Sequence, residues 1–74
     1  MLPADSAHVS WDTHKKQWNV RVKVGEEVMR RPIPGTPENA SDEVLRSLAL
    51  ETAKADGYEV DPAHIEIARP VTAL

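Results

Sequence analysis

The fold of this chain is decided between Val9 and Ile33, where the sequence reads VSWDTHKKQWNVRVKVGEEVMRRPI. From Gln17 to Val24 within this stretch, every second residue is apolar and the residues between them are polar. Strict alternation that includes β-branched residues predicts a strand with one buried face. The polar segments at 13–16 and 25–26 suit hairpin turns, the second because it contains glycine. The stretch therefore predicts a three-stranded antiparallel meander over residues 7–33.

The two turns also determine which residues lie opposite each other on neighbouring strands. The second turn places Val22 opposite Met29, and the first places Trp11 opposite Trp18. Both registers gather the apolar side chains on one face, and a slip of one residue would move a strand's apolar set to the other face. Arg31 departs from this pattern, because the same register puts it on the apolar face. We expect its guanidinium to reach past the sheet edge, or the strand to bulge there.

A helix is predicted over residues 41–57, after a proline-rich loop at 34–40. Ser41 is a good N-cap, and the two residues after it are acidic, which suits the N-terminal end of the helix dipole. Gly57 suits the position just after the helix, where a left-handed backbone is common. The residues at helical spacing that we expect to face the sheet are Leu45, Leu48, Ala49 and Thr52.

Residues 64–69 read as a short fourth strand, because two isoleucines alternate there with other residues before a proline. The predicted fold is therefore α+β with the order β-β-β-α-β: an antiparallel three-stranded meander, one helix packed on its apolar face, and a short last strand. We expect the spatial order 3-2-1-4, in which the last strand runs parallel to the first. Residues 1–74 then form a single small domain, with a frayed tail at 1–6 and a second tail at 70–74.

The composition excludes several classes of protein. With 74 residues, the chain is too short for the nucleotide-binding folds of cofactor enzymes. It has no cysteine, so disulfides, thiolate metal sites and thiol nucleophiles are excluded, and we expect a cytoplasmic protein. The N-terminal segment has neither the basic region nor the apolar run of a signal peptide, and no apolar run reaches membrane-spanning length. We therefore expect no membrane partner.

The net charge of −3 is unevenly distributed along the chain. Residues 1–33 contain six basic and four acidic side chains, whereas residues 34–74 contain three basic and eight acidic ones. The first part is thus basic and the second part is acidic. A chain of this kind can bind an anion with its basic part, pair its own halves, or associate with a second copy of itself.

The polar face of the meander is the first candidate for a binding surface. Sheets that read DNA present arginine and lysine to phosphates and base edges in the major groove. A solvated face is the simpler interpretation, because antiparallel sheets commonly expose one polar side and phosphate binding commonly uses about 6–10 contacts. The candidate nucleic-acid contacts are Lys15, Lys16, Arg21, Lys23 and Arg30.

A local resemblance bears on the same face. Residues 8–12, HVSWD, and residues 15–22, KKQWNVRV, resemble the start of AP2-type domains and of integrase arm-binding domains. The shared features are a strand that ends in Trp-Asp, a basic turn and a second strand that opens with tryptophan. The resemblance implies that the sheet binds the DNA major groove through the basic residues named above. The acidic balance, the Glu26-Glu27 turn, the proline-rich loop and the strand after the helix depart from that pattern.

Catalytic and metal sites have little support in the sequence. His8 and Ser10 lie on the same open face, but hydrolysis needs a nucleophile, a base and an oxyanion site held in a cleft. The chain has no HxH or HExxH motif, whose spacing brings metal ligands together. We therefore expect no enzyme activity, no metal and no cofactor.

Protein binding is the function that the sequence favours. One helix covers only part of a four-stranded sheet, so the margins at Met29, Arg31 and Leu50 and the edge of the third strand are candidate protein contacts. We expect a non-enzymatic protein-interaction or accessory module that binds another protein or forms a homodimer. Nucleic-acid binding through the basic outer face is the alternative, and its steeper dependence on salt distinguishes the two.

Overall fold

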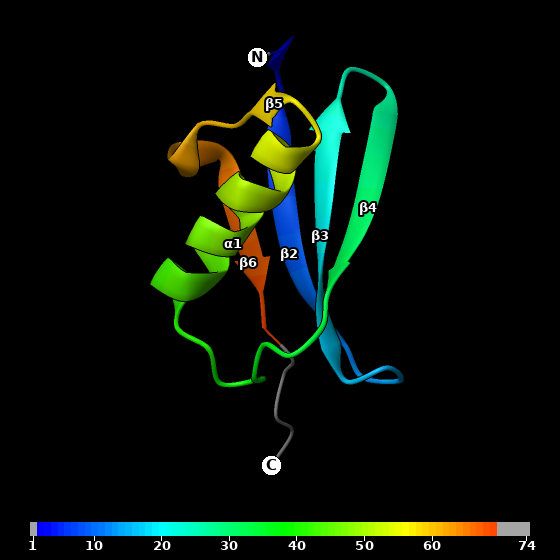
Figure 1. Cartoon of the computed structure of the whole chain (residues 1–74), viewed down its shortest axis with the longest axis vertical. Coiled ribbons are helices and arrows are strands. Elements are labelled where there is room, and N and C mark those ends of the chain that lie inside the picture. Colours follow the sequence, from blue (N-terminus) through cyan, green and yellow to red (C-terminus); the bar gives the residue numbers. More distant parts are fainter. Residues whose placement is uncertain (1, 70–74) are drawn as a thin grey trace.

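The computed structural model describes residues 2–69, which form a sheet with a helix lying across one face (Figure 1). In chain order the elements are β1 (Leu2–Pro3), β2 (Ser6–Asp12), β3 (Gln17–Val24), β4 (Glu27–Ile33), α1 (Asp42–Ala55), β5 (Tyr58–Glu59), a 3₁₀ turn η1 (Pro62–His64) and β6 (Ile65–Ala68). Within these residues the four-stranded sheet has the order β4-β3-β2-β6, and β6 runs parallel to β2. The predicted α+β class and the strand order 3-2-1-4 are confirmed.

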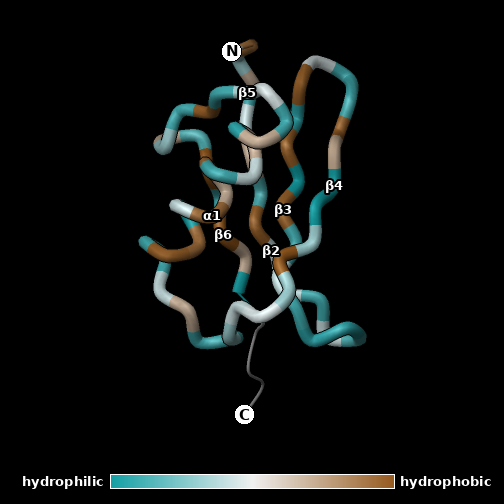
Figure 2. The backbone as a smooth tube through the Cα atoms, viewed as in Figure 1, coloured by the Kyte–Doolittle hydropathy of each residue, from teal (hydrophilic) through white to brown (hydrophobic). Residues whose placement is uncertain are grey.

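The meander has both predicted registers. Val22 is paired with Met29, and Trp11 is paired with Trp18. The two tryptophan rings meet edge to face, with their centroids 5.3 Å apart. Gly25 has a φ of 61°, which is the conformation that its tight hairpin turn requires. Figure 2 shows the resulting alternation of hydrophobic and hydrophilic residues along β3.

Arg31 stays in register on β4 opposite Val20, so the strand does not bulge at this position. Its Nε lies 3.1 Å from Oδ2 of Asp56, which is the C-cap residue of α1. The Arg31 side chain is half exposed, and its charge is met by a carboxylate from the helix end.

α1 begins after Ser41, whose hydroxyl accepts a hydrogen bond from the backbone N–H of Val44 at 3.3 Å. The residues of α1 that the sheet buries are Leu45, Ala49 and Ala53. The predicted stripe is therefore wrong in part, because Leu48 and Thr52 are only half buried. The three buried residues recur at every fourth position and form a stripe narrower than the predicted one. Its two alanines allow the helix backbone to approach the sheet closely.

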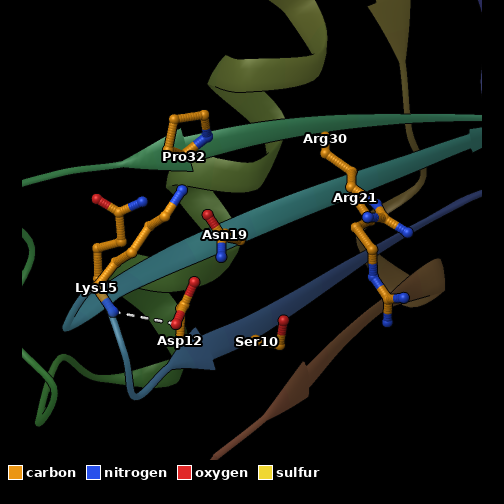
Figure 3. A pocket seen from close by; sticks show the side chains of 8 residues that line it. Ser10, Asp12, Lys15, Asn19, Arg21, Arg30 and Pro32 are labelled. Carbon is orange, nitrogen blue, oxygen red and sulfur yellow. Dashed lines mark hydrogen bonds between the residues drawn. The ribbon is translucent and has the colours of Figure 1, made fainter.

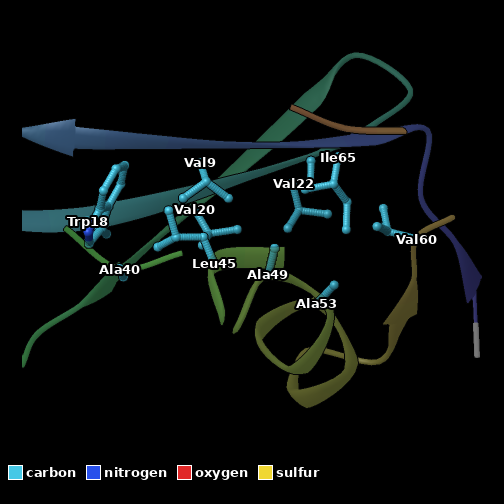
Figure 4. Close-up of a cluster of buried hydrophobic side chains, with 11 residues drawn as sticks. Val9, Trp18, Val20, Val22, Ala40, Leu45, Ala49, Ala53, Val60 and Ile65 are labelled. Atoms are coloured by element: carbon cyan, nitrogen blue, oxygen red, sulfur yellow. The ribbon is translucent and has the colours of Figure 1, made fainter. Parts of the chain in front are cut away.

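The hydrophobic core of residues 2–69 lies between α1 and the sheet (Figure 4). It consists of Ala7, Val9, Trp18, Val20, Val22, Ala40, Leu45, Ala49, Ala53, Val60 and Ile65. None of the side chains buried in this part of the chain is polar or charged. The face of the sheet that α1 leaves uncovered therefore carries the polar residues of the strands.

The proline-rich loop before α1 is tied to the sheet by Trp18. The indole Nε1 donates a hydrogen bond to the carbonyl of Pro37 at 2.8 Å. The guanidinium of Arg69 lies 5.9 Å from the centroid of the Trp18 ring, donates to the carbonyl of Ala40 at 2.7 Å, and forms an ion pair with Asp42. These contacts close the end of the core nearest the start of α1.

The prediction of a frayed tail at residues 1–6 is wrong for residues 2–6, while Met1 lies outside the described residues. β1 pairs in parallel with β5, and the backbone N–H of Ala4 donates to the carbonyl of Glu59 at 2.8 Å. The N–H of Asp5 donates to the carbonyl of Lys23 at 2.8 Å, so this segment leads directly into β2. Strands of two residues have no hydrophobic periodicity, and the sequence pattern therefore gives no sign of them.

The last strand begins at Ile65 and ends at Ala68, so it is shorter than the predicted range of 64–69. His64 instead belongs to the turn η1, which Asp61 caps by accepting a hydrogen bond from the N–H of Ala63 at 2.9 Å. The N–H of His64 donates to the carbonyl of Asp61 at 2.8 Å. The predicted tail at 70–74 lies outside the described residues.

Candidate functional site

The face of the sheet opposite α1, called the outer face below, is built from alternate residues of four strands. The registers of β2, β3, β4 and β6 give its members: Ser6, His8, Ser10, Asp12, Gln17, Asn19, Arg21, Lys23, Val28, Arg30, Pro32, Glu66 and Ala68. One row of this face runs straight across the sheet, from Arg30 through Arg21 and His8 to Glu66. This row places two arginines side by side.

Arg21 and Arg30 are the unusual feature of the row. They are directly opposite on antiparallel strands, and like charges in that arrangement repel each other. Among residues 2–69, Nε of Arg21 is buried without a hydrogen-bond partner, and no carboxylate forms an ion pair with either arginine. The charges of the two guanidinium groups are therefore not neutralised within this part of the chain, and an external anion would reduce their repulsion.

The acid at the other end of the row, Glu66, lies beside His8 and not beside the arginines. Nδ1 of His8 lies 3.5 Å from Oε2 of Glu66, on the neighbouring strand β6. The carboxylate of Glu66 is directed to His8 and leaves Arg21 without a partner in the described chain. The positive charge of the row is therefore concentrated toward the β4 side of the sheet.

The outer face is hollowed around the two arginines. The hollow has a volume of about 570 Å³. Figure 3 shows the side chains of Arg21 and Arg30, which line it, leaving neighbouring strands. The hollow is lined by Ser10, Asp12, Lys15, Gln17, Asn19, Arg21, Arg30 and Pro32. A second hollow, of about 190 Å³, is lined by Ser6, His8, Arg21, Lys23 and Val28. Arg21 lines both hollows and lies between them.

Asp12 is the carboxylate in the larger hollow, and it holds the first turn together. Its Oδ1 accepts hydrogen bonds from the backbone N–H groups of His14 at 2.9 Å and Lys15 at 3.1 Å. The N–H of Lys15 is the main reason why the pKa of Asp12 lies below its ordinary value of 3.8. The carboxylate is therefore ionised at neutral pH, and it anchors Lys15 at the edge of the hollow.

The structure brings most of the predicted nucleic-acid contacts together. Lys15, Arg21 and Arg30 line the larger hollow, and Lys23 lines the smaller one with Arg21. Lys16 is different, because it lies in the turn with a φ of 53° and lines neither hollow. The outer face thus presents four of the five predicted cations around Arg21.

The predicted protein contacts do not form one patch. Met29 and Leu50 are half buried and pack against the core, from β4 and from α1. Arg31 is tied to Asp56. Leu50 lines a separate hollow of about 370 Å³ beside Tyr58, which neither Met29 nor Arg31 lines.

The free edge of β4 is protected against pairing with another strand. Pro32 has no N–H, so it is tolerated only where its backbone nitrogen points away from β3. Arg30 lies two residues earlier on the strand, so its backbone N–H and carbonyl also point away from β3. Its carbonyl accepts a hydrogen bond from Nη1 of Arg31 at 3.0 Å. A proline and an occupied carbonyl on one short strand disfavour the addition of a partner strand here.

Val28, Pro32 and Glu66 are members of the outer face that sequence reasoning missed. Val28 and Pro32 lie two residues before and after Arg30 on β4, so the predicted register already placed their side chains on the same face as Arg30. The side chain of Val28 is 51% exposed beside Lys23. Glu66 was missed for another reason, because its place depends on the pairing of β6 with β2.

Within residues 2–69, no three His, Asp or Glu side chains converge as metal ligands would. The helix of this part of the chain is neither long nor apolar enough to cross a membrane. Comparisons of the chain with models of protein families, with curated proteins and with solved structures find no match. The resemblance to DNA-binding domains therefore rests on residues 8–22 alone.

Proposed function

We propose that this chain is a small, non-enzymatic binding module that engages an acidic segment of a partner protein through the outer face of its sheet. The observation that carries the proposal is the opposed pair Arg21 and Arg30, which lines an open hollow and has no carboxylate partner among the described residues. An acidic partner would supply the missing acceptors.

The outer face supports this role better than the sheet edge does. Strand addition needs free backbone groups, and on β4 a proline and an occupied carbonyl reduce them. The outer face has the opposite character, with a hollow, four cationic side chains from Lys15, Arg21, Lys23 and Arg30, and two carboxylates from Asp12 and Glu66.

The exposed Val28 favours a protein as the partner. Its side chain is 51% exposed next to the cations, and an apolar contact of this kind suits a peptide that carries both acidic and apolar residues. Four cations are also fewer than the about 6–10 phosphate contacts that strong duplex binding commonly uses.

Nucleic-acid binding is the second candidate, and a specific observation favours it. Ser10, Gln17 and Asn19 line the same hollow as the arginines. Hydroxyl and amide side chains of this kind bond to base edges and phosphates when a sheet enters a groove. This candidate also agrees with the resemblance of residues 8–22.

The test is a fluorescence anisotropy titration with two labelled probes: a short peptide of alternating glutamate and leucine, and a mixed-sequence duplex DNA. Each is titrated at about 50 mM and about 200 mM salt. The variant Arg21→Gln/Arg30→Gln is compared with Lys54→Gln, which removes a cation from the exposed surface of α1. A peptide in which glutamine replaces glutamate controls for apolar contact.

We expect the glutamate peptide to bind the wild type saturably. Lys54→Gln should retain this binding, and Arg21→Gln/Arg30→Gln should lose it. Tighter binding of the DNA, with a steep loss at the higher salt, would replace the proposal with the nucleic-acid candidate. Binding that is equal for the glutamate and glutamine peptides would contradict it. Light scattering of the protein alone is part of the test, because it measures the oligomeric state. If the wild type is a dimer and Arg21→Gln/Arg30→Gln is a monomer, the outer face binds a second copy of the chain instead.

A further inference from the structure

We infer that Arg21 and Arg30 form one subsite, which holds a single oxyanion group between their two guanidinium groups. The inference deepens the proposed function and rests on it, because the oxyanion would belong to the segment that the outer face binds. The two residues are register partners on β3 and β4, so neighbouring backbones determine their spacing. A fixed spacing is what distinguishes a subsite from a general positive charge.

The opposed arginines are unfavourable in the isolated chain. Directly opposed like charges on a sheet destabilise it, and among the described residues nothing neutralises these two. An oxyanion placed between them would replace repulsion with two attractions. The pair is therefore expected to gain more from one shared anion than either arginine would gain alone.

The two guanidinium groups together offer many donors. Each has five N–H donors in a planar fork, and a fork matches an acceptor with two oxygens. Arg21 and Arg30 line the same hollow, where Arg21 is half buried and Arg30 is exposed. A carboxylate or a phosphate has enough oxygens to accept from both residues, whereas chloride has no such directional lone pairs.

The nearby acids do not neutralise the two arginines. Asp12 accepts hydrogen bonds from the backbone of the first turn, and Oε2 of the exposed Glu66 lies 3.5 Å from Nδ1 of His8. Within residues 2–69, neither carboxylate lies within 4 Å of a guanidinium nitrogen of Arg21 or Arg30. An incoming oxyanion therefore does not have to displace an internal carboxylate.

The experiment follows the arginine Nε–Hε signals by NMR while the folded protein is titrated with inorganic phosphate or with acetate, at constant ionic strength set by chloride. The signals of Arg21 and Arg30 are expected to move along one saturable curve, while those of Arg31, Arg46 and Arg69 move little. Arg30→Gln is expected to weaken the binding seen at Arg21 by about tenfold, and Lys54→Gln is expected to leave it unchanged.

The two anions separate the sources of the oxyanion. Tighter binding of acetate supports a side-chain carboxylate, and tighter binding of phosphate supports a phosphate group, and either result supports the subsite. Equal shifts at all five arginines, or an unchanged affinity in Arg30→Gln, would overturn it. If the glutamate peptide binds but neither anion selects Arg21 and Arg30, the subsite fails and the proposed function stands. If an anion selects them but the peptide does not bind, the proposed function fails alone.

Discussion

Nε of Arg31 on the edge strand β4 lies 3.1 Å from Oδ2 of Asp56 at the C-terminal end of α1. This ion pair joins the least covered strand of the sheet to the helix. The two side chains are 47% and 24% exposed, so water screens the attraction in part. We predict that Arg31→Met lowers the free energy of unfolding by about 0.5–1 kcal/mol. Urea unfolding of Arg31→Met, Asp56→Asn and the double variant measures the coupling, and additive effects would contradict the pair.

Trp18 is predicted to hold the proline-rich loop through its indole N–H. Trp18→Phe removes the hydrogen bond to the carbonyl of Pro37 and leaves a small void in the core, where Trp18 is fully buried. The expected loss in the free energy of unfolding is about 1–3 kcal/mol. Trp11→Phe is the matched control, because Trp11 is only half buried. Equal losses in the two variants would show that the loop contact contributes nothing.

Much of this fold could be predicted because its largest part is a local pattern. The alternation along β3 and the two turns determine the meander and both registers, and Ser41 and Gly57 mark the ends of α1. The pairing of β1 with β5 could not be predicted, since it depends on contacts between residues more than fifty positions apart in two-residue strands.

The candidate site was predictable only in outline. The cations of β3 and β4 were visible in the sequence, and the register already placed Arg21 opposite Arg30. Two facts needed coordinates: Glu66 is paired with His8, and the carbonyl of Arg30 is occupied by Arg31. Both facts depend on which side chains meet across strands, and composition does not contain that information.

Asp12 is predicted to contribute to acid stability. The N–H of Lys15 keeps its pKa below 3.8 in the folded chain, so the carboxylate form favours folding. That contribution is present above the unfolded value of 3.8 and is lost as pH falls below it toward the folded pKa. Asp12→Asn should therefore lose less stability than the wild type on acidification through this range. Urea midpoints measured from neutral to strongly acidic pH test this, and parallel curves would contradict it.

Charge reversal at Arg30 is predicted to move stability and binding in opposite directions. Arg30→Glu turns the repulsion with Arg21 into a cross-strand ion pair, which should raise the free energy of unfolding by up to about 1 kcal/mol at low salt. The same change should abolish binding of the glutamate peptide. Urea unfolding at low and high salt tests the first effect, with Arg30→Gln expected between the wild type and Arg30→Glu. A lower stability for Arg30→Glu would mean that the two arginines are not in conflict.

The most direct test of the binding surface is an amide NMR map of the labelled protein during titration with the glutamate peptide. The account predicts that the shifted amides cluster on β2, β3 and β4 around Arg21, disappear at high salt, and are absent in Arg30→Glu. Shifts that gather instead beside Leu50 and Tyr58, or that persist unchanged in Arg30→Glu, would show that the outer face is a solvated surface and would contradict the central claim.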